Sequence, residues 1–320
     1  MEEINMDLFL VARQMLVLFG MMLIGFFIFR LHWLEQDTVS RLSRLVVNIF
    51  NPFLTISSVF GKSYAATGNL FWENLLLVGI FYGILFVAGI LLVVLIRPEK
   101  ADSPIYRLMT LLPNCGFMGI PVVSALLGKQ YIIYVAIYML AYNIIIYTYG
   151  IHLVTKEKKS RDKETRPGDL LRKLRPIFLN SGVIASVIAL ILFFGGFTVP
   201  ESVECFCNYM GNPCIPLSMM LIGCSLAAAN IPAMLKNIRL YGFLLLKMLL
   251  VPISCTLLIR HLPFDPAILK LFILMLSMPA GSMVVLVTEE YGGRTECAAS
   301  GVALSTLASI VTIPIVSLFL

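Results

Sequence analysis

Two short motifs place a proline beside small or polar residues inside long apolar stretches. Pro113-Asn114-Cys115-Gly116 interrupts residues 108–128, and Pro279-Ala280-Gly281-Ser282 interrupts residues 266–288. Proline lacks an amide hydrogen and clashes with the preceding helical turn, so each motif predicts a break in a helix. In a bilayer, backbone groups freed by a break must be satisfied by protein or by a water-filled cavity. Each break therefore predicts either a packed kink or a binding site.

Two broken helices that face one another would suit an anion. A helix N-terminus carries unpaired amide groups and roughly half a positive charge, and two of them form an anion site without a cationic side chain. The expected donors are the amides around residues 115–117 and 281–283, together with the side-chain amide of Asn114. Small side chains let a ligand approach the backbone closely. The substrate-binding residues predicted at the breaks are Pro113, Asn114, Cys115, Gly116, Pro279, Ala280, Gly281 and Ser282.

The composition is that of a polytopic membrane protein. Of the 320 residues, 59% are hydrophobic and 13% are charged, whereas a soluble domain carries about 25% charged residues. The acidic N-terminus lacks the basic region and the cleavage site of a secretory signal. The net charge of +6 does not indicate a nucleic-acid partner, because most basic residues fall in short connections between apolar stretches. No cysteine and histidine spacing typical of a metal site occurs, and no cofactor is predicted.

Ten apolar stretches are long enough to cross a bilayer, which takes about 20 residues. These spans, numbered 1 to 10, cover residues 8–29, 42–60, 70–96, 105–127, 131–153, 177–197, 204–227, 238–259, 266–288 and 297–320. A charged segment divides them into five and five. The breaks therefore lie in spans 4 and 9.

Basic residues are distributed unequally between alternate connections. Counted together with the adjoining ends of the spans, the connections after spans 1, 3, 5, 7 and 9 contain 18 lysines and arginines, and those after spans 2, 4, 6 and 8 contain four. Because basic connections stay in the cytoplasm, both termini are expected outside. With five spans per half, the second half enters the membrane in the opposite orientation. The predicted domains are a first repeat (1–154), a basic cytoplasmic linker (155–175) and a second, inverted repeat (176–320).

Internal likeness supports this inverted repeat. Asn51-Pro52 in span 2 and Asn212-Pro213 in span 7 coincide at a shift of 161 residues, and the breaks at Pro113 and Pro279 coincide at a shift of 166. Interrupted spans at corresponding positions of two halves point to the binding site of a transporter. This symmetry favours a binding site over a plain kink. Asn51 and Asn212 are added to the predicted substrate-binding residues.

Charged residues are nearly absent from the middle of the spans. All six aspartates lie in connections or at span edges, and Glu289 and Glu290 lie at the cytoplasmic end of span 9. A cation exchanger built on buried aspartates is therefore not expected. Lys247 lies about 10 Å inside span 8. It either extends to the lipid headgroups or is buried, pairs with Glu289 or Glu290, and acts in coupling or gating.

Three stretches together are similar to the auxin efflux carrier family of permeases. They are residues 114–121 in span 4, residues 216–226 in span 7, and a C-terminal run that includes residues 278–280, 289–292 and 304–307. The central linker of 21 residues favours the bacterial branch of organic-acid permeases. Asn114 matches the asparagine that this family has at its crossing helices. The equivalent position of the second repeat is Ala280.

The resemblance implies an all-α fold of ten transmembrane helices, arranged as two inverted five-helix repeats in which the broken helices 4 and 9 cross. Helices 1, 2, 6 and 7 would form a scaffold, often dimeric, against which helices 3–5 and 8–10 move. The implied function is elevator-type transport of a small organic anion, a carboxylate such as malate or an auxin-like acid, across the cytoplasmic membrane.

Other classes of protein fit less well. A sodium-coupled organic anion symporter of similar architecture is an open alternative, and the coupling ion, H⁺ or Na⁺, is not predicted. A receptor has no obvious use for paired breaks. An enzyme is not expected, because the three histidines lie near span ends and no H-E-x-x-H motif occurs.

Overall fold

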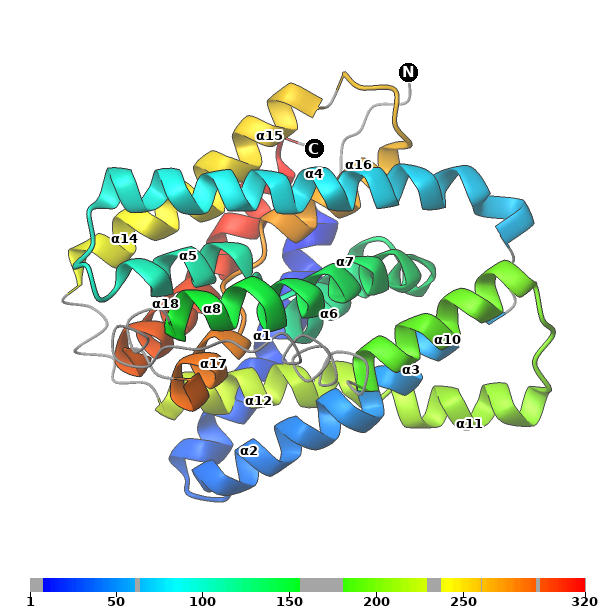
Figure 1. Cartoon of the computed structure of the whole chain (residues 1–320). Helices are drawn as coiled ribbons and strands as arrows, with labels where there is room; N and C mark the ends of the chain where they lie inside the picture. Colours follow the sequence, from blue (N-terminus) through cyan, green and yellow to red (C-terminus); the bar gives the residue numbers. More distant parts are fainter. Residues whose placement is uncertain are drawn as a thin grey trace, which may run out of the picture.

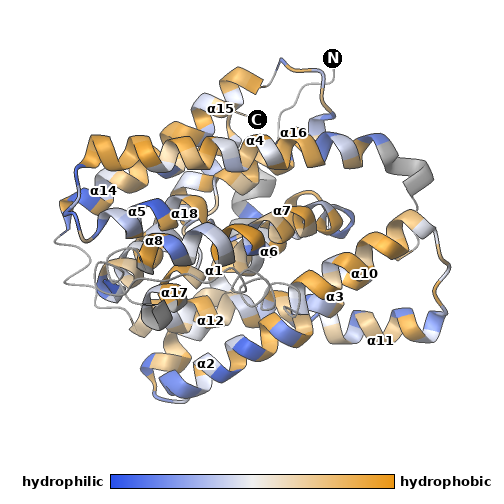
Figure 2. Ribbon diagram, in the orientation of Figure 1, coloured by the Kyte–Doolittle hydropathy of each residue, from blue (hydrophilic) through white to orange (hydrophobic). Residues whose placement is uncertain are grey.

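The computed structural model describes residues 8–60, 64–155, 181–228, 237–259, 261–291 and 294–319, and every regular element in these ranges is helical (Figure 1). Each of the ten predicted spans coincides with helix over most of its described residues, and spans 4 and 9 are interrupted near their middle. Five helices are long and apolar enough to cross a membrane, and further apolar helices are shorter. Hydrophobic residues cover most of these helices, while hydrophilic residues gather at the connections and on α2 (Figure 2). The protein is a polytopic membrane protein.

The described helices follow the order of the predicted spans. In the first half they are α1 (Leu8–Arg30), α2 (Gln36–Leu45), η1 (Val46–Phe50), α3 (Asn51–Ser57), α4 (Tyr64–Ile96), α5 (Ser103–Leu111), η2 (Cys115–Gly119), α6 (Ile120–Leu126), η3 (Lys129–Tyr131), α7 (Ile132–Ile145), η4 (Ile146–Gly150) and α8 (Ile151–Thr155). In the second half they are α10 (Ser181–Gly195), α11 (Glu201–Gly211), α12 (Cys214–Ala228), α14 (Ile238–Leu245), η6 (Leu246–Leu250), α15 (Val251–Ile259), α16 (Pro266–Leu276), α17 (Met283–Tyr291) and α18 (Thr295–Ser317).

Wide π-helical turns precede three of the prolines inside the spans. The turns η1, η2 and η6 end just before Pro52, Pro121 and Pro252, respectively. Each proline removes one backbone donor from its helix. A local change to wider turns is one way in which membrane helices satisfy the freed backbone groups. The helices therefore continue through these prolines, in contrast to the breaks at Pro113 and Pro279.

One group of helices consists of α1, α3, α10, α11 and α12. Helix α1 packs along α12, and α3 packs on α10 and α11. The contact between α1 and α12 is made backbone to backbone: a Cβ atom added at Gly25 would lie 2.0 Å from the carbonyl oxygen of Met220, and one at Gly223 would lie 1.9 Å from that of Met22. The thiol of Cys224 donates a hydrogen bond to the carbonyl of Gly25 at 3.2 Å. Glycine at these positions allows the close packing that associates helices in membranes.

A second group contains α4 to α8 and α14 to α18, with the turns between them. Helix α4 packs on α5 and α16, and α18 packs on α5, α17 and η6. Where α1 and α12 meet this group, a separate set of buried apolar residues forms what we name the methionine cluster. Its members are Leu18, Phe19, Met22, Met118, Val122, Met219, Leu274, Met278 and Ile313.

Candidate functional site

The two interrupted spans pair with one another at their breaks. Helix α5 ends at Leu111 and helical structure resumes at Cys115, while α16 ends at Leu276 and α17 begins at Met283. Pro113 and Ala280 form an isolated antiparallel bridge. The amide of Asn114 donates to the carbonyl of Pro279 at 2.7 Å, and the amide of Gly281 donates to the carbonyl of Leu112 at 2.7 Å. We name residues 112–114 and 277–282 the crossover. The predicted breaks are confirmed.

The protein itself satisfies several backbone groups that the breaks set free. The amide of Cys115 donates to the carbonyl of Pro113 at 2.7 Å, and the amide of Ala280 donates to the hydroxyl of Ser305 at 3.1 Å. A Cβ atom at Gly281 would lie 3.0 Å from both the carbonyl oxygen of Leu112 and the hydroxyl oxygen of Tyr142. Glycine at position 281 is therefore what allows the two chains to approach closely enough to bond.

Other amides at the crossover are free to bind a ligand. Within the described ranges, the amides of Gly116, Phe117, Ser282 and Met283 have no hydrogen-bond acceptor. These donors begin the two helical segments that leave the crossover. The amides of Cys115 and Gly281, which the sequence suggested as donors, are instead occupied by backbone carbonyls.

Asn114 lies at the centre of this arrangement and is 5% exposed. Its backbone is fully used, because its carbonyl also accepts a hydrogen bond from the amide of Gly119 at 2.8 Å. Its side-chain amide has no hydrogen-bond partner among the residues that the structure describes. Buried polar groups are normally hydrogen-bonded. The side chain is therefore a donor and an acceptor that a bound ligand could satisfy.

Lys247, on η6, also reaches the crossover. The side chain is 1% exposed, and its ammonium group donates a hydrogen bond to the carbonyl of Met278. Among the described residues, its ammonium group also interacts electrostatically with the thiol of Cys115. Extension to the lipid headgroups, one of the two interpretations of the sequence, is wrong because the side chain points into the protein. Glu289 lies on α17, and its side chain is outside the described part, so its pairing with Lys247 stays a prediction.

Asn51 and Asn212 occupy a different place. They lie where α3 and α11 cross. The two helices are close there, since a Cβ atom added at Gly211 would lie 2.8 Å from the backbone of Leu54. Asn51 is 9% exposed and its Oδ1 atom is unpaired among the described residues, whereas Asn212 is exposed and accepts a hydrogen bond from Lys129 at 3.0 Å. The structure shows no hydrogen bond between either asparagine and the crossover, so a role for them in substrate binding stays a prediction.

Two residues at the crossover were not suggested by the sequence. Ser305 comes from α18 and Tyr142 from α7, and both are buried. A serine or a tyrosine within an apolar span is common, and neither lies beside a proline motif. Ser305 lies in the stretch 304–307 that carries the family resemblance, but nothing in the sequence marked either residue as part of the site.

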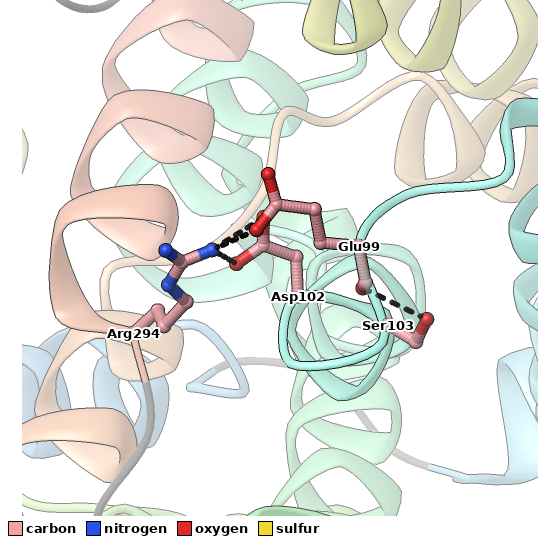
Figure 3. Close-up of polar contacts among 4 residues, drawn as sticks. All are labelled: Glu99, Asp102, Ser103 and Arg294. Carbon is pink, nitrogen blue, oxygen red and sulfur yellow. Dashed lines mark hydrogen bonds and ion pairs between the residues drawn. The ribbon is translucent and has the colours of Figure 1, made fainter.

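An ion-pair cluster in which Arg294 and Glu99 are exposed and Asp102 is buried joins two connections of the second helix group (Figure 3). The guanidinium of Arg294, just before α18, lies 2.6 Å from a carboxylate oxygen of Glu99 and 3.2 Å from one of Asp102, just before α5. The hydrogen bond to Glu99, followed by the interactions with Asp102, raises the pKa of Arg294. The cluster ties together the ends of α5 and α18 that lie away from the crossover.

A polytopic helical protein with paired helix breaks and unpaired donors around them has the organisation of a secondary transporter. A family model described as a membrane transport protein matches residues 10–317. The chain therefore belongs to this family of transporters, the auxin efflux carrier family, and is not an enzyme. It is 25% identical over 312 residues to an uncharacterized transporter of Methanocaldococcus jannaschii, with 93% of this chain and 95% of that protein covered.

Proposed function

We propose that the protein is a secondary transporter that moves a small organic anion, a carboxylate such as malate or an auxin-like acid, across the cytoplasmic membrane. The observation that carries the proposal is the paired breaks around the free side-chain amide of Asn114. Amides at the start of helices favour negative charge. No described carboxylate bonds to a crossover residue, so no acidic side chain among the described residues would repel an anion there.

The proposed architecture is ten transmembrane helices in two inverted repeats, residues 1–154 and 176–320, joined by the linker 155–175. Most of this linker lies outside the described residues. The antiparallel bridge between Pro113 and Ala280 supports the inverted relation, since each break occupies the same place in its half. Helix packing supports it too. Helix α1 of the first half packs on α12 of the second, and α10 of the second half packs on α3 of the first. These two pairs correspond when the repeats are exchanged.

Transport would proceed by an elevator-type movement of helices 3–5 and 8–10 against a scaffold of helices 1, 2, 6 and 7. The two helix groups of the fold support this division, since α1, α3, α10, α11 and α12 belong to the scaffold spans. The methionine cluster lies where the two groups meet. Methionine is unbranched and flexible, so this interface can repack as the groups slide. The scaffold is also the proposed surface for a homodimer.

The proposed orientation places both termini outside and the linker in the cytoplasm, as the basic residues predict. A cysteine at position 161, introduced as Arg161→Cys in a cysteine-free background, should react with a membrane-impermeant thiol reagent only after the cells are opened. Labelling of intact cells from outside would overturn the topology and the inverted repeat with it. Position 161 lies in the part of the linker that the structure does not describe.

Transport itself is tested in proteoliposomes. Purified protein should take up labelled malate or labelled indole-3-acetate, and Asn114→Ala should reduce this uptake. The assay is run with a Na⁺ gradient, with a pH gradient and with neither. Dependence on Na⁺ would favour the alternative, a sodium-coupled organic anion symporter of similar architecture. Failure to take up either acid under all three conditions, with protein that is folded, would refute the proposed substrate class.

A further inference from the structure

The four half-helix ends at the crossover contribute opposite charges. Two of them are N-termini, at Cys115 and Met283, and two are C-termini, at Leu111 and Leu276. Each N-terminus carries roughly half a positive charge and each C-terminus roughly half a negative charge. Beyond about one turn of helix these partial charges cancel. The free amides can therefore orient a carboxylate by hydrogen bonding, but the helix ends supply little net charge to attract one.

Lys247 is the ionisable side chain that can supply the positive charge missing from this balance. Its ammonium group bonds to the carbonyl of Met278 and is 1% exposed, and it forms no ion pair within the described ranges. The turn η6 packs against α4, α14, α15 and α18. The described carboxylates on these helices are engaged or distant: Glu73 accepts a hydrogen bond from the amide of Asp265, and Glu296 is exposed at the start of α18.

We infer that Lys247 makes the crossover selective for a negatively charged substrate, and that one substrate carboxylate balances its charge. The inference rests on the proposed function. An uncompensated charge inside a protein is costly, so a bound carboxylate removes a cost that an uncharged analogue leaves in place. The ammonium donates to the carbonyl of Met278, so it acts on the substrate through its charge and not as a direct ligand. In the first repeat, Asn114 supplies a polar group at the break. Ala280, at the equivalent position of the second repeat, has none, and Lys247 supplies it instead.

The test compares acids with their amides, which differ in charge and little in shape. The probes are malate with malamide and indole-3-acetate with indole-3-acetamide, bound to purified protein in lipid nanodiscs at neutral pH. Lys247→Gln removes the charge but keeps a donor for the carbonyl of Met278, and Lys247→Arg keeps the charge. Lys270→Gln is the matched control, because Lys270 is half-buried on α16 and its side chain forms no hydrogen bond or ion pair with the crossover among the described residues.

For an acid that the parent binds, Lys247→Gln should lower the ratio of acid to amide affinity at least about tenfold, as expected for a lost charge–charge interaction inside a protein. Lys247→Arg and Lys270→Gln should keep most of the ratio. A purely structural role would weaken acid and amide equally and leave the ratio unchanged. Thermal melting without probe shows whether each variant is folded, and Lys247→Met, which suits the apolar surroundings, replaces the glutamine variant if that variant does not melt cooperatively.

Two results would be negative and they differ. If charge-free variants keep the acid preference of the parent, the role of Lys247 is refuted while the proposed function stands. If the parent binds neither acid, or binds the amides as well as the acids, the proposed function fails and the inference fails with it.

Discussion

Replacing Asn114 perturbs the crossover at one chemical group. The two hydrogen bonds of this residue use its main chain alone: its amide donates to the carbonyl of Pro279, and its carbonyl accepts from the amide of Gly119. Its backbone φ angle of −76° is accessible to alanine. Asn114→Ala therefore keeps the pairing of the two breaks and removes only the free side-chain amide. Asn114→Asp keeps the shape of the side chain and adds a negative charge.

The expected loss follows from that one group. A hydrogen bond to a charged partner contributes about 1.5–3 kcal/mol, so Asn114→Ala should weaken the binding of a carboxylate roughly ten- to a hundredfold. Asn114→Asp should bind more weakly still, because an ionised side chain repels an anion. The dissociation constants for malate and indole-3-acetate are measured with purified protein in lipid nanodiscs at neutral pH.

Asn143→Ala provides the control for Asn114. Asn143 is equally buried, at 5% exposure, but its amide donates to the carbonyl of Met139 within its own helix, α7, at 2.8 Å. This variant should lose stability rather than affinity. An Asn114→Asp protein that binds an acid as tightly as the parent would refute the anion site, and so would an Asn114→Ala protein with unchanged affinity.

Two further predictions concern what holds the helices in place. Gly223→Ala would put a methyl group 1.9 Å from the carbonyl oxygen of Met22 and should cost about 3 kcal/mol or more of folding stability, measured by denaturant unfolding. Gly79→Ala, with open space around it, is the control and should be tolerated. Equal stability of the two variants would contradict the backbone contact of α1 and α12. Ser305→Ala would leave the buried amide of Ala280 without its acceptor and should lower the free energy of unfolding by about 1–3 kcal/mol, and an unchanged unfolding midpoint would show that this bond does not hold the crossover.

The sequence predicted the two breaks because their cause is local. Proline at positions 113 and 279 removes a backbone donor wherever the surrounding helix lies, so the breaks could be predicted without knowledge of the neighbours. The same holds for the helical stretches, whose apolar length was sufficient evidence. The pairing of one break with the other is a long-range contact. It was expected from the likeness of the two halves rather than from either break alone.

The sequence predicted how deep in span 8 Lys247 lies, but not which side of the helix it faces. In a membrane protein, residues that face lipid are as apolar as those that face the core, so hydropathy does not reveal which side of a helix is buried. In span 8 the buried residues recur at helical spacing, at positions 240, 243, 244, 247 and 248, whereas Tyr241, Leu245 and Leu250 on the other side are exposed. Ser305 escaped prediction for a similar reason, since its partner, the amide of Ala280, is brought close only by the fold.

The methionine cluster would link the proposed elevator movement to oxidation. Met22, Met118, Met219 and Met278 are buried where the groups meet, and oxidation would turn each thioether into a polar sulfoxide in apolar surroundings. Under the proposed movement an oxidant would reach these buried sulfur atoms when the groups separate, so the rate of inactivation should rise with turnover and fall when the carrier is held in one state. Oxidative damage would then accumulate in the most active molecules, and methionine sulfoxide reductases could restore them.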